Sequence, residues 1–316
     1  MMNQPLVWPP KYIDPATDFG FKRIFKDEEI TRGFLNDLVQ SRNPDVHIAS
    51  VTITDGEADE NNKDIRRVVY DVNCVTDTGD EFVIEMQNDS QDFFADRIVL
   101  YLARAASRQQ SKGYMEYTDD DGKTQKEPWN YQLKNIFGVF FMNFVDKEHP
   151  QKLSHFQFME TTDYYKDSNA LQYWKIQMPF YRKMKESDCE TVVDKWIYNL
   201  SNMPKMKTQL AFKEEKPLFV RLEKIASYSD LTREQQWQYD SSFHNYISYH
   251  GQLATKLREG KELGFAEGEE KGRAEGRAEG RAEAMRETAI NLKKAGVDVQ
   301  FISQITNLTI EEINAL

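Results

Sequence analysis

Residues 66–87 read RRVVYDVNCVTDTGDEFVIEMQ, and they predict two strands joined by a tight turn. In the second strand, residues 81–87, side chains alternate with period two, which is typical of a half-buried strand. One face is expected to carry three apolar side chains, Phe82, Ile84 and Met86. The other face carries Glu85 and Gln87, although such residues form strands poorly and are costly to bury without partners. This pair therefore needs a chemical explanation.

The turn between the two strands decides which side chains face each other. Asp77-Thr78-Gly79 fits a three-residue hairpin loop with its glycine in the left-handed conformation. Such a loop places Asp71 directly opposite Glu85, with their Cβ atoms roughly 5 Å apart. A two-residue loop would place Met86 opposite Asp71 instead, so the prediction depends on the turn.

Two facing carboxylates destabilise a sheet unless a shared proton, an arginine or a divalent cation compensates their repulsion. Mg²⁺ is a hard cation that takes oxygen ligands from carboxylates, water and substrate phosphate. Asp71 and Glu85 have this chemistry, and Gln87 beside them has the groups to hold a water or a phosphate oxygen. The alternative is a strand whose polar side simply faces solvent.

A helix expected over residues 92–112 supports contact with phosphate. Its basic stripe consists of residues at helical steps of three and four, namely Arg97, Tyr101, Arg104, Arg108 and Lys112. A solvated helix face more often mixes both signs of charge, whereas here the first acid after Asp96 is Glu116. A line of cations beside an acidic metal site suits binding of a phosphodiester backbone.

The rest of the sequence predicts an α/β core followed by helices. Further strand patterns lie at residues 48–53, 136–144, 155–160 and 172–179, and the first hairpin strand is expected to span 68–75. Residues 118–126, TDDDGKTQK, are polar and predict a loop. From about residue 190 to residue 250 the pattern is helical. Strands mixed with helices indicate a central sheet with an all-α extension.

The last part of the chain is repetitive. Glycine occupies every fourth position from Gly260 to Gly280, in a background of glutamate, arginine and alanine that favours helix. Two interpretations remain open, a solvated and partly helical spacer or a surface for self-association. Beyond it, two short helices are expected around Gly296, with Thr309 and Glu312 as a capping box. This pair resembles a small helix-turn-helix but lacks a basic recognition face.

The bulk composition limits the classes of function. The net charge of −11 over 316 residues counts against general nucleic-acid binding but allows a local basic patch. The two cysteines, Cys74 and Cys189, form neither a disulfide framework nor a CxxC motif, which fits a reducing compartment. The first residues do not read as a signal peptide, and no run reaches about 18 apolar residues. We therefore expect a cytoplasmic protein without a membrane partner.

These motifs together resemble a known group of nucleases. Asp71, followed after a hairpin by Glu85-Met86-Gln87, is similar to the D…(E/D)xK core of the PD-(D/E)xK nuclease superfamily. DFGFKRIF near the start and YLARAASRQQSKGY in the basic helix narrow the resemblance to the recombination-promoting nuclease/putative transposase family. Gln110 and Tyr114 match a QxxxY pattern found after the core in some related nucleases. The resemblance extends over about residues 12–250.

The resemblance implies a restriction-endonuclease-like central mixed sheet with flanking helices and an α-helical C-terminal extension. It implies that Asp71 and Glu85 bind Mg²⁺, with the Met86 carbonyl completing the ligand set and Asp18 as a remote ligand or only a helix cap. Gln87 stands where the superfamily has lysine, and a carboxamide orients water or phosphate without supplying charge. Contacts to DNA are expected from Lys22, Arg97, Arg104, Arg108, Gln110 and Tyr114.

The expected organisation is a nuclease-like core at 12–185, a helical extension at 186–255, a glycine-repeat linker or oligomerisation tail at 256–287 and a helix-turn-helix-like pair at 288–316. The expected function is Mg²⁺-dependent hydrolysis of DNA phosphodiester bonds, linked to recombination or mobile elements. One alternative is a non-catalytic nucleic-acid-binding or assembly module with a degenerate site. The other is an RNase or toxin-like nuclease. A homo-oligomer through the glycine-repeat helix, residues 260–287, is the protein partner considered.

Overall fold

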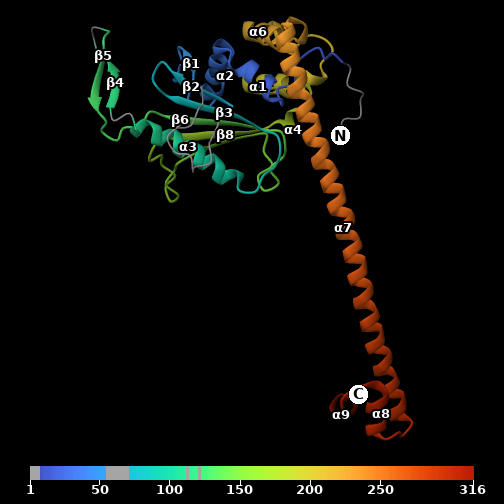
Figure 1. Cartoon of the computed structure of the whole chain (residues 1–316). Coiled ribbons are helices and arrows are strands. Elements are labelled where there is room, and N and C mark those ends of the chain that lie inside the picture. The colour runs from blue at the N-terminus through green and yellow to red at the C-terminus, as the bar shows by residue number, and fades with distance from the viewer. Residues whose placement is uncertain (1–7, 55–70, 112–113, 120–121) are drawn as a thin grey trace. The chain divides into compact units, whose positions relative to one another are not determined.

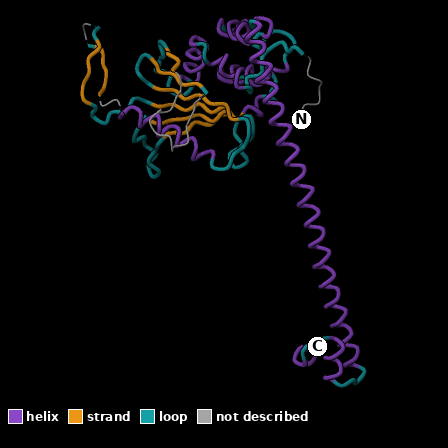
Figure 2. Tube along the Cα trace, viewed as in Figure 1, coloured by secondary structure: helices purple, strands orange, loops and turns teal. Residues whose placement is uncertain are grey.

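The computed structural model describes residues 8–54, 71–111, 114–119 and 122–316. The chain divides into two compact units, residues 1–245 and residues 246–316. The first unit contains a mixed sheet covered by helices, and the second contains helices only (Figure 1 and Figure 2). This arrangement confirms the predicted α/β fold with a helical C-terminal extension.

The main sheet of the first unit has six strands in the order β1-β2-β3-β6-β8-β7. Their bounds are β1 Val51–Thr54, β2 Val72–Thr76, β3 Glu81–Gln87, β6 Ile136–Met142, β7 Leu153–Gln157 and β8 Leu171–Gln177. The three central strands, β3, β6 and β8, run parallel, while the outer pairs are antiparallel. The carboxyl ends of the parallel strands therefore meet at one edge of the sheet.

Helices cover both faces of this sheet. The first unit contains α1 Asp18–Phe25, α2 Glu28–Gln40, α3 Phe94–Ser111, α4 Met178–Tyr181, α5 Val192–Asn202, α6 Pro217–Ala226 and the start of α7 Arg233–Lys294. Figure 1 shows α3 on the opposite side of the sheet from α1 and α2. The apolar side chains of α3 pack with β3 and β6, whereas α1, α2, α5 and α6 share the larger core on the other face.

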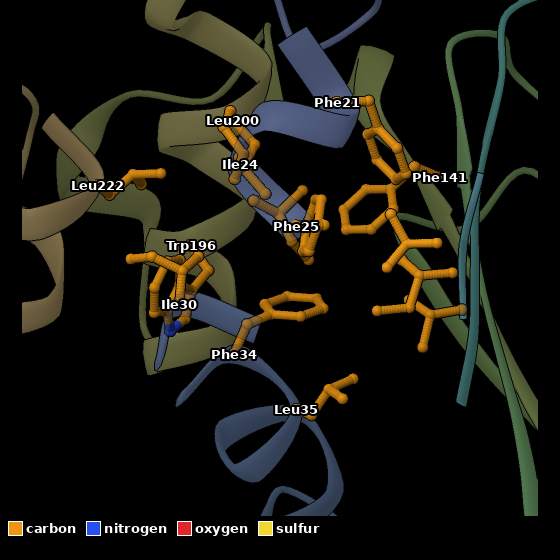
Figure 3. Packing of buried hydrophobic residues seen from close by; sticks show 14 of the residues in the cluster. Phe21, Ile24, Phe25, Ile30, Phe34, Leu35, Phe141, Trp196, Leu200 and Leu222 are labelled. Atoms are coloured by element: carbon orange, nitrogen blue, oxygen red, sulfur yellow. The ribbon is translucent and has the colours of Figure 1, made fainter. Parts of the chain in front are cut away.

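The larger core is rich in aromatic rings. Phe25 of α1 lies 5.3 Å, centroid to centroid, from Phe141 of β6. Phe34 of α2 makes an edge contact with Trp196 of α5 at 5.9 Å. Figure 3 shows how these side chains from α1, α2 and α5 converge on the sheet. Because the clusters on the two faces enclose β3, its six residues 81–85 and 87 are buried.

The burial of β3 corrects the expectation of a half-buried strand. Its period-two alternation is real, but both faces are covered, as is usual for the central strands of a parallel sheet. Glu85 and Gln87 therefore lie beneath α3 and do not face open solvent. The strand expected at 136–144 forms β6, which ends at Met142 and is buried along its full length as predicted.

The loop predicted over residues 118–126 is wrong in its extent. β4 Tyr114–Thr118 and β5 Thr124–Pro128 pair as a separate antiparallel hairpin, so residues 118 and 124–126 belong to strands and not to a loop. All five residues of β5 are exposed. An exposed strand needs no alternation of apolar side chains, and its sequence, TQKEP, consequently carries no signal of a strand.

The second unit consists of the C-terminal part of α7 (Arg233–Lys294) with α8 Val299–Thr306 and α9 Ile310–Ala315. The glycine repeat is helical throughout. The helix break at Gly296, whose φ is +78°, and the predicted capping box of Thr309 and Glu312 are both confirmed. A small core joins these helices through Ala289, Ile302 and Ile313. No helix in the described part of the chain is long and apolar enough to cross a membrane.

Candidate functional site

The β2–β3 hairpin fixes the geometry of the candidate site. Gly79 adopts a φ of +84°, and the Thr76 N–H donates to the Asp80 carbonyl at 2.9 Å. The ladder pairs Val72 with Ile84, so the next position brings Asp71 opposite Glu85. The predicted three-residue turn and its register are confirmed. Residues 68–70, which were expected to begin the first strand, lie outside the described residues.

The carboxylates of Asp71 and Glu85 each accept a hydrogen bond from a backbone N–H across the hairpin. The Asp71 N–H donates to Glu85 Oε1 at 3.0 Å. The Met86 N–H donates to Asp71 Oδ2 at 2.8 Å. Each carboxylate is therefore oriented by an N–H group of the opposite strand. Only 5% of Glu85 is exposed, so the two negative groups face each other in a poorly hydrated place.

The electrostatics of this pair favour uptake of a positive charge. Burial, followed by the negative charge of Asp71, raises the pKa of Glu85 to about 8. Burial also raises the pKa of Asp71, while the Met86 N–H and Lys22 act in the opposite direction. Both shifts mean that the buried pair resists carrying two negative charges, unless a proton or cation compensates.

Arg97 of α3 brings a guanidinium to the same place. Its Nη1 donates to Gln87 Oε1 and to Gln91 Oε1, both at 3.1 Å, and its Nη2 lies 3.9 Å from Glu85 Oε2. Its Nε donates to the Tyr101 hydroxyl at 2.9 Å, and its guanidinium carbon lies 5.0 Å from that ring's centroid. The structure thus brings together Asp71, Glu85, Gln87 and Arg97. The sequence predicted a cation of this helix beside the acidic pair, but not the contact of Arg97 with Gln87.

α1 approaches the carboxylate pair from the N-terminal segment. Thr17 caps this helix, because its hydroxyl accepts from the Gly20 N–H at 3.0 Å. Asp18 is therefore the first helical residue and not the cap, which corrects one of the two roles considered for it. Its carboxylate pairs with Lys22 at 2.7 Å, and both charges influence the pKa of Asp71.

The rest of the predicted basic stripe extends away from Glu85 along α3. Arg108 pairs with the buried Glu81, and Arg104 lies half-buried between Arg97 and Arg108. Since a helix rises about 1.5 Å per residue, the backbone of Gln110 lies about 20 Å from that of Arg97 along the axis of α3. The stripe thus faces acids of β3 at two points, and the apparent excess of positive charge in α3 is partly neutralised within the fold. Lys112 lies outside the described residues.

Gln110 and Tyr114 are not brought to the carboxylate pair. Gln110 lies near the end of α3, and its side chain is outside the described part of the chain. Tyr114 belongs to the separate β4–β5 hairpin, where Lys126 lies over its ring at 4.0 Å from the centroid. If these residues contact a substrate, they contact it at a distance from Glu85.

Sequence reasoning missed a polar network at the carboxyl ends of the parallel strands. Asn88 follows β3 and donates to the Ala16 carbonyl at 2.8 Å, while Asn143 follows β6 and donates to Asn88 Oδ1 at 3.1 Å. Arg182, beyond α4, bonds to Asn143 Oδ1. Polar residues directly after parallel strands gather at one edge of a sheet, so this rule would have identified both asparagines. Arg182 carries no comparable local signal.

The residues present fit a magnesium ion held mainly by oxygen atoms from outside the chain. Among the described residues, no group of three histidine, cysteine or acidic side chains is arranged to hold a metal. Mg²⁺ does not need such a group, because it commonly keeps several waters and binds one or two carboxylates plus substrate phosphate. The Asp71–Glu85 pair offers those two carboxylates, with mutual repulsion that a cation would relieve.

The fold and the site together define an α/β protein of the PD-(D/E)XK nuclease type. The model of the family described as PD-(D/E)XK nuclease family transposase matches residues 15–255, which include the whole sheet and every residue of the site. The chain belongs to this family, so the resemblance seen in the sequence is confirmed, and family membership indicates a nuclease-like function. Comparisons with curated proteins and with solved structures gave no match.

Proposed function

We propose that this chain is a cytoplasmic, Mg²⁺-dependent endonuclease that hydrolyses DNA phosphodiester bonds during recombination or the movement of mobile elements. The observation that carries the proposal is the buried Asp71–Glu85 pair, in which burial raises the pKa of both carboxyl groups and the charge of Asp71 raises that of Glu85 further. The family supports nuclease chemistry in general. The metal, the DNA substrate and the biological process are parts of the proposal.

In this proposal Asp71 and Glu85 hold the ion, and Asp18 is a more distant acidic partner. When bound, Mg²⁺ supplies an activated water and stabilises negative charge on the phosphate. In the hydrolysis, water adds to phosphorus and one P–O ester bond breaks, which leaves a terminal phosphate and a hydroxyl. The protein's own part is to orient the two carboxylates, which the Asp71 and Met86 N–H groups achieve.

The phosphate backbone needs local cations, because the whole chain carries a net charge of −11. Lys22 of α1 and Arg97 of α3 lie next to the carboxylate pair and are the nearest candidates. Arg104 and Arg108, with Gln110 and Tyr114 farther along, would extend the contact along α3. Lys22 is about one-third exposed, so it can turn from Asp18 to a substrate phosphate at little cost.

The proposal is tested by cleavage of supercoiled plasmid with Mg²⁺, Ca²⁺ or EDTA. Glu85→Ala should lower Mg²⁺-dependent nicking by at least about 100-fold, since even outer-shell changes at metal sites cost 10- to 100-fold. Glu148→Ala removes an exposed acid elsewhere in the same unit and is the matched control. Undiminished cutting by purified Glu85→Ala protein would contradict the assignment of the site.

The two alternatives give different results in the same experiment. A non-catalytic binding module should retain plasmid in a gel shift, with the usual dependence on salt, yet yield no product in any metal. An RNase should cut an RNA of matching sequence in preference to DNA, and Glu85→Ala should abolish that cutting. Either result would replace the DNA endonuclease assignment.

A further inference from the structure

Uncharged Gln87 occupies the strand position that holds a lysine in the superfamily core, and the Arg97 guanidinium lies beside it. We infer that Arg97 supplies this charge to the scissile phosphate and that Gln87 is the positioning residue that holds the Arg97 guanidinium. The inference rests on the proposed function. It assigns separate roles to two residues that lie on different elements, β3 and α3.

The Gln87 carboxamide is engaged at both ends within the fold. Its Oε1 accepts from Arg97 Nη1 at 3.1 Å, and its Nε2 donates to the Asp89 carbonyl at 2.9 Å. The side chain is buried, with 8% of its surface exposed. Because the Asp89 bond fixes which end of the amide faces α3, the oxygen is presented to the guanidinium. Gln87 is thus built to orient a cation rather than to touch substrate.

Arg97 is held firmly but is not enclosed. Tyr101 bonds its Nε on one side, Gln87 and Gln91 bind Nη1, and the aromatic face lies against the guanidinium. The side chain keeps 35% of its surface exposed. A planar guanidinium that is fixed by several partners and still reaches solvent is well suited to bind phosphate oxygens.

The position of Nη2 indicates where a phosphate would lie. Nη2 is 3.9 Å from Glu85 Oε2, which is too long for a hydrogen bond and short enough for attraction. A phosphate oxygen next to Glu85 would therefore lie within reach of this nitrogen. Arg104 provides the contrast, because it lies seven residues, about two helical turns, farther along α3 than Arg97.

The test removes the positive charge from residue 97 of α3 and places one at residue 87 of β3. Arg97→Gln should lower kcat about 100- to 1,000-fold, the usual cost of losing one donor to a reacting oxyanion, with a much smaller change in KM. Adding Gln87→Lys to Arg97→Gln should restore kcat at least tenfold, because the ammonium then carries the charge. Gln87→Lys should not rescue Arg104→Gln, which is the matched control. Thermal melting checks that each variant is folded.

A readout independent of cleavage is the ¹⁵Nε–H resonance of Arg97 in the full chain. It should shift when a short DNA duplex is added with Ca²⁺, and Gln87→Ala should broaden it or reduce that shift. An unmoved resonance, an unchanged kcat in Arg97→Gln, or a folded Arg97→Gln/Gln87→Lys double variant without rescue would each overturn the inference. If the wild-type protein cuts no DNA, the proposed function is wrong instead. The resonance would then still show whether Arg97 contacts the DNA.

Discussion

Asp194 is a buried acid whose charge is balanced locally. Asp194 lies in the first turn of α5, where its carboxylate accepts from the Thr191 N–H at 3.1 Å and from Lys152 Nζ at 2.8 Å. Burial alone would raise the pKa of Asp194, but the bonds from Lys152 and Thr191 outweigh it and lower the pKa below its usual value. The folded state therefore prefers the ionised form.

The sign of the resulting pH dependence follows from this preference. Because the folded pKa of Asp194 is lowered, its stabilisation is present above the unfolded value of 3.8 and is lost as pH falls through the folded value. Asp194→Asn should cost about 1–2 kcal/mol at pH 7, reduced by the exposure of Lys152. Urea unfolding at pH 7 and pH 3 measures this. An equal cost at both pH values would contradict the explanation.

Single residues also show where sequence reasoning reached its limit at the site. Asp71 and Glu85 were predictable, because their pairing needs only the strand period and a correct turn. The contact of Gln87 with Arg97 was not, since it depends on which way α3 crosses the sheet. Arg182 reaches Asn143 from a distant part of the chain, and no local spacing encodes such a contact.

The β2–β3 turn is the element on which the site depends. Gly79 has a φ of +84°, and the space where a Cβ would lie meets only Lys134 carbons at 3.5 Å or more. A substitution here is therefore strained by its backbone and not by a clash. Gly79→Ala should destabilise the protein by about 1 kcal/mol, whereas Gly79→Asn should cost less because asparagine tolerates this conformation. Thermal unfolding of both variants measures the difference, and equal costs would argue against backbone strain.

Elements differ in how well their sequence predicts them. β6 was recognised because its run of apolar residues favours a buried strand. Helix was expected on both sides of residue 255 because helix-forming residues dominate there, but the single helix α7 that joins the two parts was not predicted. β3 was recognised as a strand, but its second buried face was hidden, since polar Glu81, Glu85 and Gln87 are covered only once α3 packs on them. The β4–β5 hairpin is outside any core and had no apolar pattern to reveal it.

At the scale of the molecule, the first unit contains all that the proposed chemistry needs. Its core includes Tyr239 from the start of α7, and the family match ends at residue 255. A chain of residues 1–255 should therefore melt within about 3 °C of the full chain's first-unit transition, a shift that corresponds to about 1 kcal/mol in a domain of this size. Differential scanning calorimetry measures both proteins.

The same truncation tests the organisation proposed for the C-terminal region. If residues 256–287 and 288–316 form a separate tail, the fragment 1–255 should also keep Mg²⁺-dependent nicking within about twofold, with its salt dependence unchanged. A folded fragment that no longer cuts would mean that the tail, by assembly or by contact with substrate, takes part in the reaction.

The short distance along the chain between Asp71 and Glu85, 14 residues, has a consequence for the order of folding. Hairpins close in about 1–10 μs, and contacts that are local in sequence form with little loss of chain entropy. Arg97 and Lys22 arrive only when α3 and α1 dock on the sheet. We therefore expect the two carboxylates to be the first parts of the site to meet. Their repulsion would then oppose the hairpin until Arg97 and Lys22 arrive, so that docking of α3 and α1 stabilises the strand pair as well as the site.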